Sequence, residues 1–474
     1  MSENKLPMII QGGMGAGVSN WVLARAVAML GQLGVVSGTA LDVIMARRLQ
    51  DGDPNGDVRR ALDYFPIHDV AKRIIETYFV SGGKKPEESY KPVPVQNLNP
   101  TKFLTELCVA ANFVEVFLAR EGHDGPVGIN YLEKIQFPHL SSIYGAMLAG
   151  ASVIIMGAGI PREIPSVIDQ LCSHSKAVYS VHVADSMGKR SVQMNFDPEE
   201  LGFKNLLPLT RPKFIPIISS EILAVILSKK TEGKIDGFII EGPTAGGHNA
   251  PPRGILKLDS EGQPEYGKRD VVNLDVMRKL GIPFWLAGSY GSNAKLKEAL
   301  QLGAEGIQVG TAFALCKESG LKKEYKDELL RLAFEGCTKV KTDPLASPTG
   351  FPFKVASVAG TLSEEEVFKA RTRICDLGYL REPYIKEDGG IGYRCSAEPV
   401  DIYLQKGGKI EDTIGRKCLC NSLMSNIGMA QVRSDGSIEL ALITCGDDLC
   451  NVTNFCSKEN PEYSAADVIR ILLG

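Results

Sequence analysis

Residues 237–248 have the sequence Gly-Phe-Ile-Ile-Glu-Gly-Pro-Thr-Ala-Gly-Gly-His. The apolar run Phe238–Ile240 between two glycines predicts a short strand that is buried on both faces. Gly246 and Gly247 have no side chains, so the backbone there can approach a flat ligand closely. His248 follows just beyond the C-terminal end of the strand, and barrel enzymes carry their catalytic residues at that end of their strands. We therefore interpret His248 as a functional residue rather than a loop histidine held by a backbone carbonyl.

Similar apolar runs recur along the chain and predict further strands. The predicted strands are Met8–Gln11, Val35–Ser37, Val127–Tyr131, Val153–Met156, Phe214–Ile218, Phe238–Ile240, Phe284–Ala287 and Ile307–Val309. Helix-like segments lie between them, at Trp21–Leu30, Ser142–Leu148, Ile164–Leu171, Ile222–Leu227 and Leu296–Leu302. Eight strands with crossover helices favour an α/β fold of the (β/α)8 TIM-barrel type over an open doubly wound sheet. We assign one more apolar run, Ala177–Val183, to an insertion over about residues 177–211.

Length and charge narrow the class of protein. The chain has 474 residues, which fits one large domain with an appendage, and a formal net charge of -3 without a basic stripe. Nucleic acid is therefore not an expected partner. The first residues lack an apolar signal core, and no apolar run approaches the roughly 20 residues that a membrane span needs. We expect a cytoplasmic protein, and the odd number of cysteines, 11, fits a reducing compartment.

The composition changes after the predicted barrel. We expect a barrel domain over residues 1–355 and a C-terminal cysteine-rich cap over residues 356–474, since seven of the 11 cysteines fall between Cys375 and Cys456. Four of them could form a four-sulfur zinc or iron–sulfur site: Cys375, Cys395, Cys418 and Cys420. Only the last two are closely spaced, and no CxxC pair occurs, so we favour reduced packing cysteines and predict no metal.

Glycine-rich loops follow the first, seventh and eighth predicted strands. The loop Gly288–Gly291 and the pair Gly310 and Thr311 stand where barrels commonly bind a phosphate. The loop after the first strand contains Gly12, Gly13 and Met14, whose backbone amides could bond a heteroaromatic ring. It has neither a Gly-Lys-Ser/Thr sequence nor a good dinucleotide-binding fingerprint. These loops predict a ligand that has both a phosphate and a flat ring.

An ordered set of motifs resembles the nitronate monooxygenase family, formerly called 2-nitropropane dioxygenases, and the related FMN-dependent enoyl-acyl carrier protein reductases. The resemblance covers about residues 7–355. Its motifs are Pro7–Gly15, Gly128–Asn130, Gly157–Pro161, Ala245–His248, Gly288–Gly291 and Gln308–Thr311. The segment 346–354 looks like the family's loop that folds back over the site, and Lys354 there offers a positive charge.

The resemblance implies a nucleotide-binding flavoprotein with FMN as cofactor. Gly288, Gly291, Gly310 and Thr311 would hold the phosphate, and the residues that border the flavin ring would be Gly12, Gly13, Met14, Asn130, Gly246 and Gly247. Gln308 would reach the flavin edge, although a buried glutamine satisfied by neighbouring backbone is an equal alternative. His248 would be the catalytic residue, as general base or proton donor.

The implied activity is that of an oxidoreductase, a nitronate monooxygenase that oxidises alkyl nitronates with O2 to a carbonyl compound and nitrite. The chain departs from that family after His248, where Asn249-Ala250-Pro251-Pro252 stands in place of Arg-Gly. This departure is closer to enoyl reductases of polyunsaturated fatty acid and polyketide synthesis. The alternatives are therefore an NAD(P)H-dependent enoyl-thioester reductase, with an acyl carrier protein as candidate partner, and a non-catalytic flavin-binding subunit of a biosynthetic complex.

Overall fold

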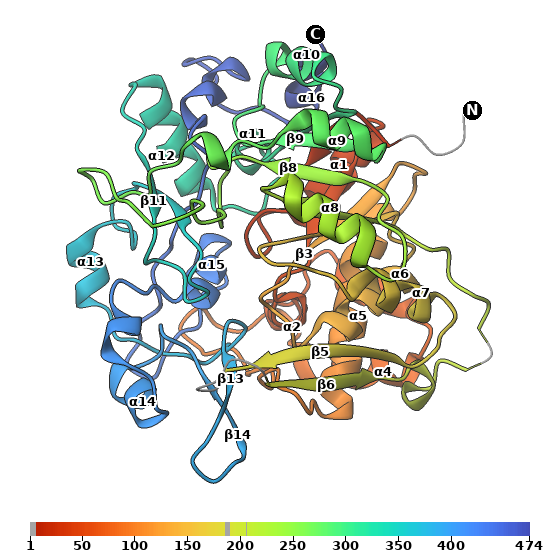
Figure 1. Ribbon diagram of the computed structural model, residues 1–474. Helices are drawn as coiled ribbons and strands as arrows, with labels where there is room; N and C mark the ends of the chain where they lie inside the picture. Colours follow the sequence, from red (N-terminus) through yellow and green to blue (C-terminus); the bar gives the residue numbers. More distant parts are fainter. Residues whose placement is uncertain (1–5, 185–189, 205) are drawn as a thin grey trace.

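Eight parallel strands form a barrel in the computed structural model, which describes residues 6–184, 190–204 and 206–474 (Figure 1). The order around the sheet is β1-β10-β9-β8-β7-β4-β3-β2. A bridge between Ile10 and Leu33 closes the barrel, since the Leu33 N–H donates to Ile9 O at 3.1 Å. The strands are β1 (Ile9–Gln11), β2 (Gly34–Ser37), β3 (Val127–Leu132), β4 (Val153–Gly157), β7 (Lys213–Ile218), β8 (Phe238–Glu241), β9 (Phe284–Ala287) and β10 (Gly306–Val309).

The barrel interior is apolar and filled by side chains. Its cluster of buried residues comprises Ile10, Leu33, Val35, Val153, Ile155, Ile215, Ile239, Trp285 and Ala287. These side chains come from β1, β2, β4, β7, β8 and β9 and from the residue just before β2, as expected where inward-facing residues stack in layers. The (β/α)8 barrel and all eight predicted strands are confirmed.

Helices cover the outside of the barrel. Those that begin with a side-chain cap include α1, where Asn20 accepts from the Leu23 N–H, and α10, where Ser292 accepts from the Lys295 N–H. The helices of the barrel segment are α1 (Trp21–Met29), α2 (Leu41–Gln50), α3 (Asp57–Asp63), α4 (His68–Tyr78), α5 (Lys102–Arg120), α6 (His139–Leu148), α7 (Ile164–Cys172), α8 (Glu221–Lys230), α9 (Leu274–Leu280), α10 (Asn293–Gln301), α11 (Thr311–Ala314) and α12 (Lys323–Phe334), with 3-10 turns at Pro198–Leu201 and Lys268–Asp270.

The connection between β2 and β3 carries four helices, α2 to α5, which the sequence reading did not predict. α4 buries Val70, Ala71, Ile74 and Tyr78 on one face, so its apolar positions follow helical spacing. A barrel needs only one crossover helix at this place, and an apolar pattern alone does not say how many helices fill a long connection. These helices pack with α6 in the largest apolar cluster of the chain.

The predicted insertion forms an antiparallel hairpin outside the barrel. β5 (Ala177–Val183) pairs with β6 (Arg190–Phe196), and alternate residues of β5 are buried. Residues 185–189 and 205 of the predicted insertion lie outside the described residues.

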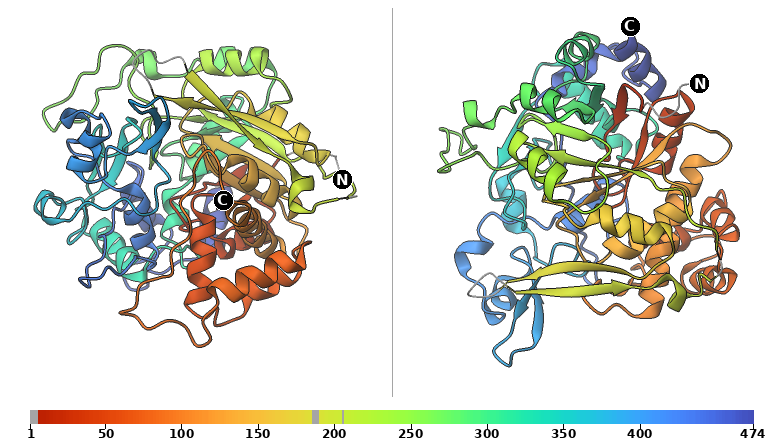
Figure 2. Two further views of the ribbon diagram at one scale, coloured as in Figure 1. Left: turned by 90° about the horizontal axis from the view of Figure 1, so that it is seen from below. Right: turned by 45° about the vertical axis from the view of Figure 1, so that its right-hand side comes forward.

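The C-terminal region packs along one side of the barrel, and its last helix returns to the outside of α1 and α10 (Figures 1 and 2). Its elements are β11 (Val340–Asp343), β12 (Phe353–Ala356), α13 (Glu365–Ala370), β13 (Glu382–Ile385), β14 (Ile391–Arg394), α14 (Val400–Gln405), η3 (Ile410–Thr413), α15 (Leu419–Asn426), η4 (Leu449–Asn454) and α16 (Ala465–Leu473). Buried residues from Ala441 to Leu472 share one apolar cluster with β8, β9 and β10. A domain boundary at residues 355 and 356 stays a prediction. None of the helices among the described residues has the length and apolar character to cross a membrane.

Candidate functional site

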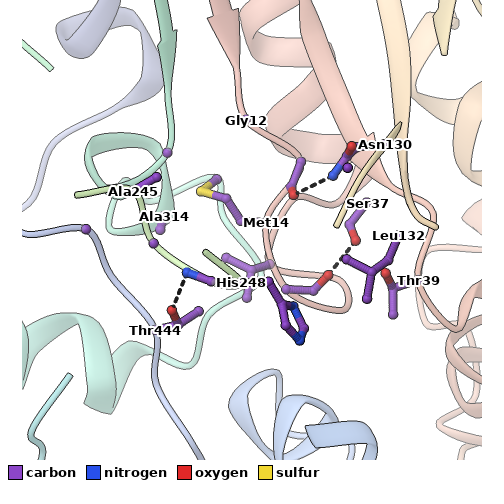
Figure 3. A pocket seen from close by; sticks show the side chains of 18 of the residues that line it. Gly12, Met14, Ser37, Thr39, Asn130, Leu132, Ala245, His248, Ala314 and Thr444 are labelled. Atoms are coloured by element: carbon purple, nitrogen blue, oxygen red, sulfur yellow. Dashed lines mark hydrogen bonds between the residues drawn. The ribbon is translucent and has the colours of Figure 1, made fainter. Parts of the chain in front are cut away.

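One cavity of the structure lies at the C-terminal ends of the barrel strands. Every residue expected to bind the cofactor or to act in catalysis lines it, and Gly12, Met14, Asn130 and His248 among them are labelled in Figure 3. These residues are Gly12, Gly13, Met14, Asn130, Gly246, Gly247, His248, Gly288, Gly291, Gln308, Gly310 and Thr311. They come from the loops after β1, β8, β9 and β10 and from β3 and β10 themselves. The structure therefore brings the separate motifs to one place.

The loop after β1 is pinned by a buried serine. Ser19 Oγ donates to Gly12 O at 2.8 Å and accepts from the Met14 N–H at 2.9 Å. A Cβ on Gly13 would lie 2.3 Å from Asn130 Cβ, so this position has room only for glycine. Asn130 Nδ2 donates to Gly13 O at 3.1 Å, which joins the loop to β3.

Two amide oxygens at the cavity have no hydrogen-bond partner among the described residues. These are Asn130 Oδ1 and Gln308 Oε1, and both residues line the cavity. For Gln308 the alternative of full satisfaction by neighbouring backbone does not hold, since its oxygen is unpaired in the described part of the chain. A buried unpaired acceptor is costly, so these two atoms are ready to receive donors from a ligand.

His248 contacts the loop that was expected to fold back over the site. Its Nε2 is hydrogen-bonded to Ser347 Oγ at 2.7 Å, and Ser347 is fully buried. The ring packs edge-on against Phe353 with centroids 4.9 Å apart. Burial lowers the pKa of His248 to about 4, so the imidazole is neutral at pH 7.

Glu241, the last residue of β8, also lines the cavity. Burial raises the pKa of its carboxyl to about 8, so the group is mostly protonated at neutral pH. The sequence motifs alone assign no role to Glu241. Its position at the C-terminal end of a barrel strand is the signal that could have identified it, because barrel enzymes carry their catalytic residues there.

The loops after β9 and β10 form the other end of the cavity. Gly288 has a φ of +91°, and a Cβ there would lie 2.9 Å from Thr244 Oγ1, so the turn requires glycine. Thr311 begins α11, and its Oγ1 accepts from the Gly446 N–H at 2.9 Å. Asp448 Oδ2 lies 3.2 Å from the position that a Cβ on Gly291 would take. Burial raises the pKa of the Asp448 carboxyl, and the neighbouring Gly291 N–H and Thr311 hydroxyl lower it in part. Gly291 and Thr311, two of the groups expected to hold a phosphate, are thus in contact with the C-terminal turn.

Residues of the C-terminal region form the rest of the cavity lining. The spacing of the sequence motifs could not indicate this. The Gly247 N–H donates to Thr444 Oγ1 at 2.7 Å (Figure 3). Other lining residues of this region include Tyr379, Leu380, Leu419, Cys420, Leu423, Met424, Ile443, Cys445 and Asp448. Their positions depend on long-range packing, since more than a hundred residues separate them from the barrel loops that they meet.

The four cysteines considered for a metal do lie in one cluster. Cys395 and Cys418 are buried together, with Cys375 and Cys420 packed against them. Within the described ranges, however, no group of three or more His, Cys, Asp or Glu side chains is arranged to hold a metal ion.

Among known protein families, the model of nitronate monooxygenase matches residues 210–345 of this chain. A probable nitronate monooxygenase of Bacillus subtilis is 34% identical over 111 residues, which is 23% of this chain and 30% of that protein. A nitronate monooxygenase of Pseudomonas aeruginosa is 34% identical over 98 residues, 20% of this chain and 25% of that protein. The matched segments thus span less than a third of these relatives. The structure of FabK from Thermotoga maritima is 16% identical with a TM-score of 0.48, and the match covers 98% of this chain and 91% of that one. The resemblance to nitronate monooxygenases that the motifs indicate is confirmed over the matched segments.

Proposed function

We propose that the protein is an FMN-dependent oxidoreductase with nitronate monooxygenase-type activity. The observation that carries this proposal is the convergence of the β1, β8, β9 and β10 loops on one cavity that His248 lines. The nitronate monooxygenase domain over residues 210–345 supports it, since this range contains His248 and the loops after β9 and β10.

The residues present fit a flavin ring at one end of the cavity. Gly12, Gly13 and Met14 leave the backbone open to a flat group, and the unpaired oxygens of Asn130 and Gln308 can accept from its imide N–H. Gly288, Gly310 and Thr311 would face the phosphate at the other end. FMN, when bound, would supply two-electron redox chemistry.

His248 would act on the substrate as a proton acceptor. The lowered pKa keeps the imidazole neutral at pH 7, and its Nε2 is fixed by Ser347. A neutral imidazole can take the proton of an acidic carbon next to a nitro group, which would convert a nitroalkane into the alkyl nitronate that is oxidised, whereas a nitronate supplied as such needs no base. The products would be a carbonyl compound and nitrite, with O2 as the other substrate.

Reduction of an enoyl thioester with NAD(P)H is the second candidate, and Glu241 favours it. A carboxyl that is protonated at neutral pH can donate a proton to the substrate carbon, which a neutral histidine does poorly. An acyl carrier protein would be the partner in that case. The third candidate, a flavin-binding subunit without turnover, would leave His248 without a catalytic role, so we rank it last.

Anaerobic mixing separates these candidates. The flavin-loaded protein is mixed with propionate 3-nitronate, NADH or NADPH, and flavin absorbance is followed. Bleaching by the nitronate alone supports the first proposal, and bleaching by a nicotinamide followed by reoxidation with an enoyl thioester supports the second. A protein that takes up no flavin contradicts both.

A further inference from the structure

Asp448 occupies the end of the cavity where a flavin phosphate is expected. A Cβ on Gly446 would lie 2.9 Å from Asp448 Oδ1 and 3.2 Å from Thr311 Oγ1, so the carboxyl and the hydroxyl flank the same glycine. Burial raises the pKa of this carboxyl, and the neighbouring Gly291 N–H and Thr311 hydroxyl lower it in part. Asp448 Oδ2 lies 3.2 Å from the position that a Cβ on Gly291 would take, so the two groups are in close contact. The Thr311 oxygen accepts from the Gly446 N–H at 2.9 Å, which leaves its proton free to point at the carboxylate.

The turn that carries Asp448 is held by the loop after β8. The Asp447 N–H donates to Thr244 O at 3.0 Å, and the Leu449 N–H closes the turn onto Gly446 O at 3.2 Å. A Cβ on Gly246 would lie 2.9 Å from the carbonyl carbon of Cys445, so the two segments touch through their backbones. These backbone contacts therefore hold the turn of Asp448 against the loop after β8.

The charges at the cavity are unfavourable for an added anion. The described residues that line the cavity include two carboxyl groups, Glu241 and Asp448, and no lysine or arginine. A phosphate that approached Gly291 and Thr311 would meet the carboxyl of Asp448, which lies against Gly291. Like charges in such contact are strongly unfavourable in a site of low dielectric constant.

We propose that Asp448 is an internal ligand of the phosphate-binding end of the cavity, and that it competes with the 5′-phosphate of FMN for Gly291 and Thr311. The inference rests on the proposed flavin site. In this state the cavity accepts the ring and ribityl chain of a flavin, and the phosphate enters only when the turn of residues 445–449 moves away. Asp448 then sets how well the protein distinguishes FMN from riboflavin, which lacks the phosphate.

Equilibrium titration of the flavin-free full-length chain tests this competition. The dissociation constants of FMN and of riboflavin are measured by flavin fluorescence for wild type and for Asp448→Asn, which keeps the shape of the side chain and removes its charge. We expect FMN to bind at least about tenfold more tightly to Asp448→Asn, while riboflavin affinity changes less than about twofold. Asp435→Asn, at an exposed turn, is the control for the loss of one negative charge, and its two constants should equal those of wild type.

Hydrogen exchange of the wild-type chain gives a second measurement that needs no variant. FMN should speed exchange at the Gly446 and Asp447 amides, whose partners are Thr311 and Thr244, and riboflavin should not. The competition would be overturned if FMN bound to Asp448→Asn with weaker or unchanged affinity, or if both flavins gained affinity equally. It would also be overturned if FMN left hydrogen exchange at the Gly446 and Asp447 amides unchanged. Failure of wild type and variant to bind either flavin would instead overturn the proposed function.

Discussion

Lys354 Nζ lies 2.6 Å from Asp447 Oδ1, and this ion pair joins the strand that covers His248 to the turn that carries Asp448. Only 4% of the Lys354 side chain is exposed, whereas Asp447 is 39% exposed. The Lys354 N–H also donates to Gly247 O at 2.9 Å. One lysine thus connects the glycine loop, β12 and the C-terminal turn around the cavity.

Asp447→Asn should lower the free energy of unfolding by about 1–3 kcal/mol, because a nearly buried ammonium loses its charged partner. Chemical denaturation measures this change. The double variant Lys354→Met/Asp447→Asn, which removes both charges, should recover part of the loss. An Asp447→Asn protein as stable as wild type would mean that the pair does not hold the turn.

His248→Ala should keep its flavin and lose about 10²- to 10⁴-fold in kcat, the usual cost of removing general acid–base help. Ser347→Ala removes the hydroxyl that is hydrogen-bonded to Nε2 and to Thr349, so we expect a smaller loss, about tenfold, in kcat rather than KM. Flavin absorbance and steady-state kinetics measure both effects. Wild-type turnover in a flavin-loaded His248→Ala protein would refute the catalytic role.

Glu241 should make stability depend on pH. Its pKa is raised to about 8 in the folded protein, whereas an unfolded glutamate titrates near 4.5. The folded state therefore binds more protons between these values, and the free energy of unfolding falls as pH rises from about 4.5 to 8.

Glu241→Gln removes this contribution. Because Glu241 faces the cavity and is partly exposed, we expect the variant to gain about 1–3 kcal/mol relative to wild type on going from pH 5 to pH 8. Denaturation curves at both pH values measure the difference. Parallel pH profiles for the two proteins would show that the carboxyl is ionised in the folded state at neutral pH.

The sequence predicted the barrel well because each strand is a short apolar run and most of these runs stand beside a glycine, as at Phe238–Ile240. It also predicted which loops meet, since the C-terminal ends of parallel barrel strands share one face. It did not predict the partners Ser347 and Asp448. Ser347 meets His248 through a strand pairing with Phe353, and Asp448 reaches Thr311 by tertiary packing, neither of which leaves a local pattern in the sequence.

The last helix provides a test of how tightly the C-terminal region is joined to the barrel. α16 buries Val468 and Leu472 in the same apolar cluster as β8, β9 and β10. Leu472 O accepts from Asn293 Nδ2 at 2.9 Å, which fastens the helix to the start of α10.

Leu472→Ala should therefore lower the free energy of unfolding by about 2–5 kcal/mol, through lost burial and a cavity in a shared core. Leu473→Ala is the matched control, because that side chain is 41% exposed and its loss should cost less than about 0.5 kcal/mol. Unfolding is followed by far-UV circular dichroism and, in the flavin-loaded protein, by flavin fluorescence. We expect both signals to change in one transition that moves to lower denaturant in Leu472→Ala. A separate early transition without flavin release would show that the C-terminal region unfolds independently of the barrel.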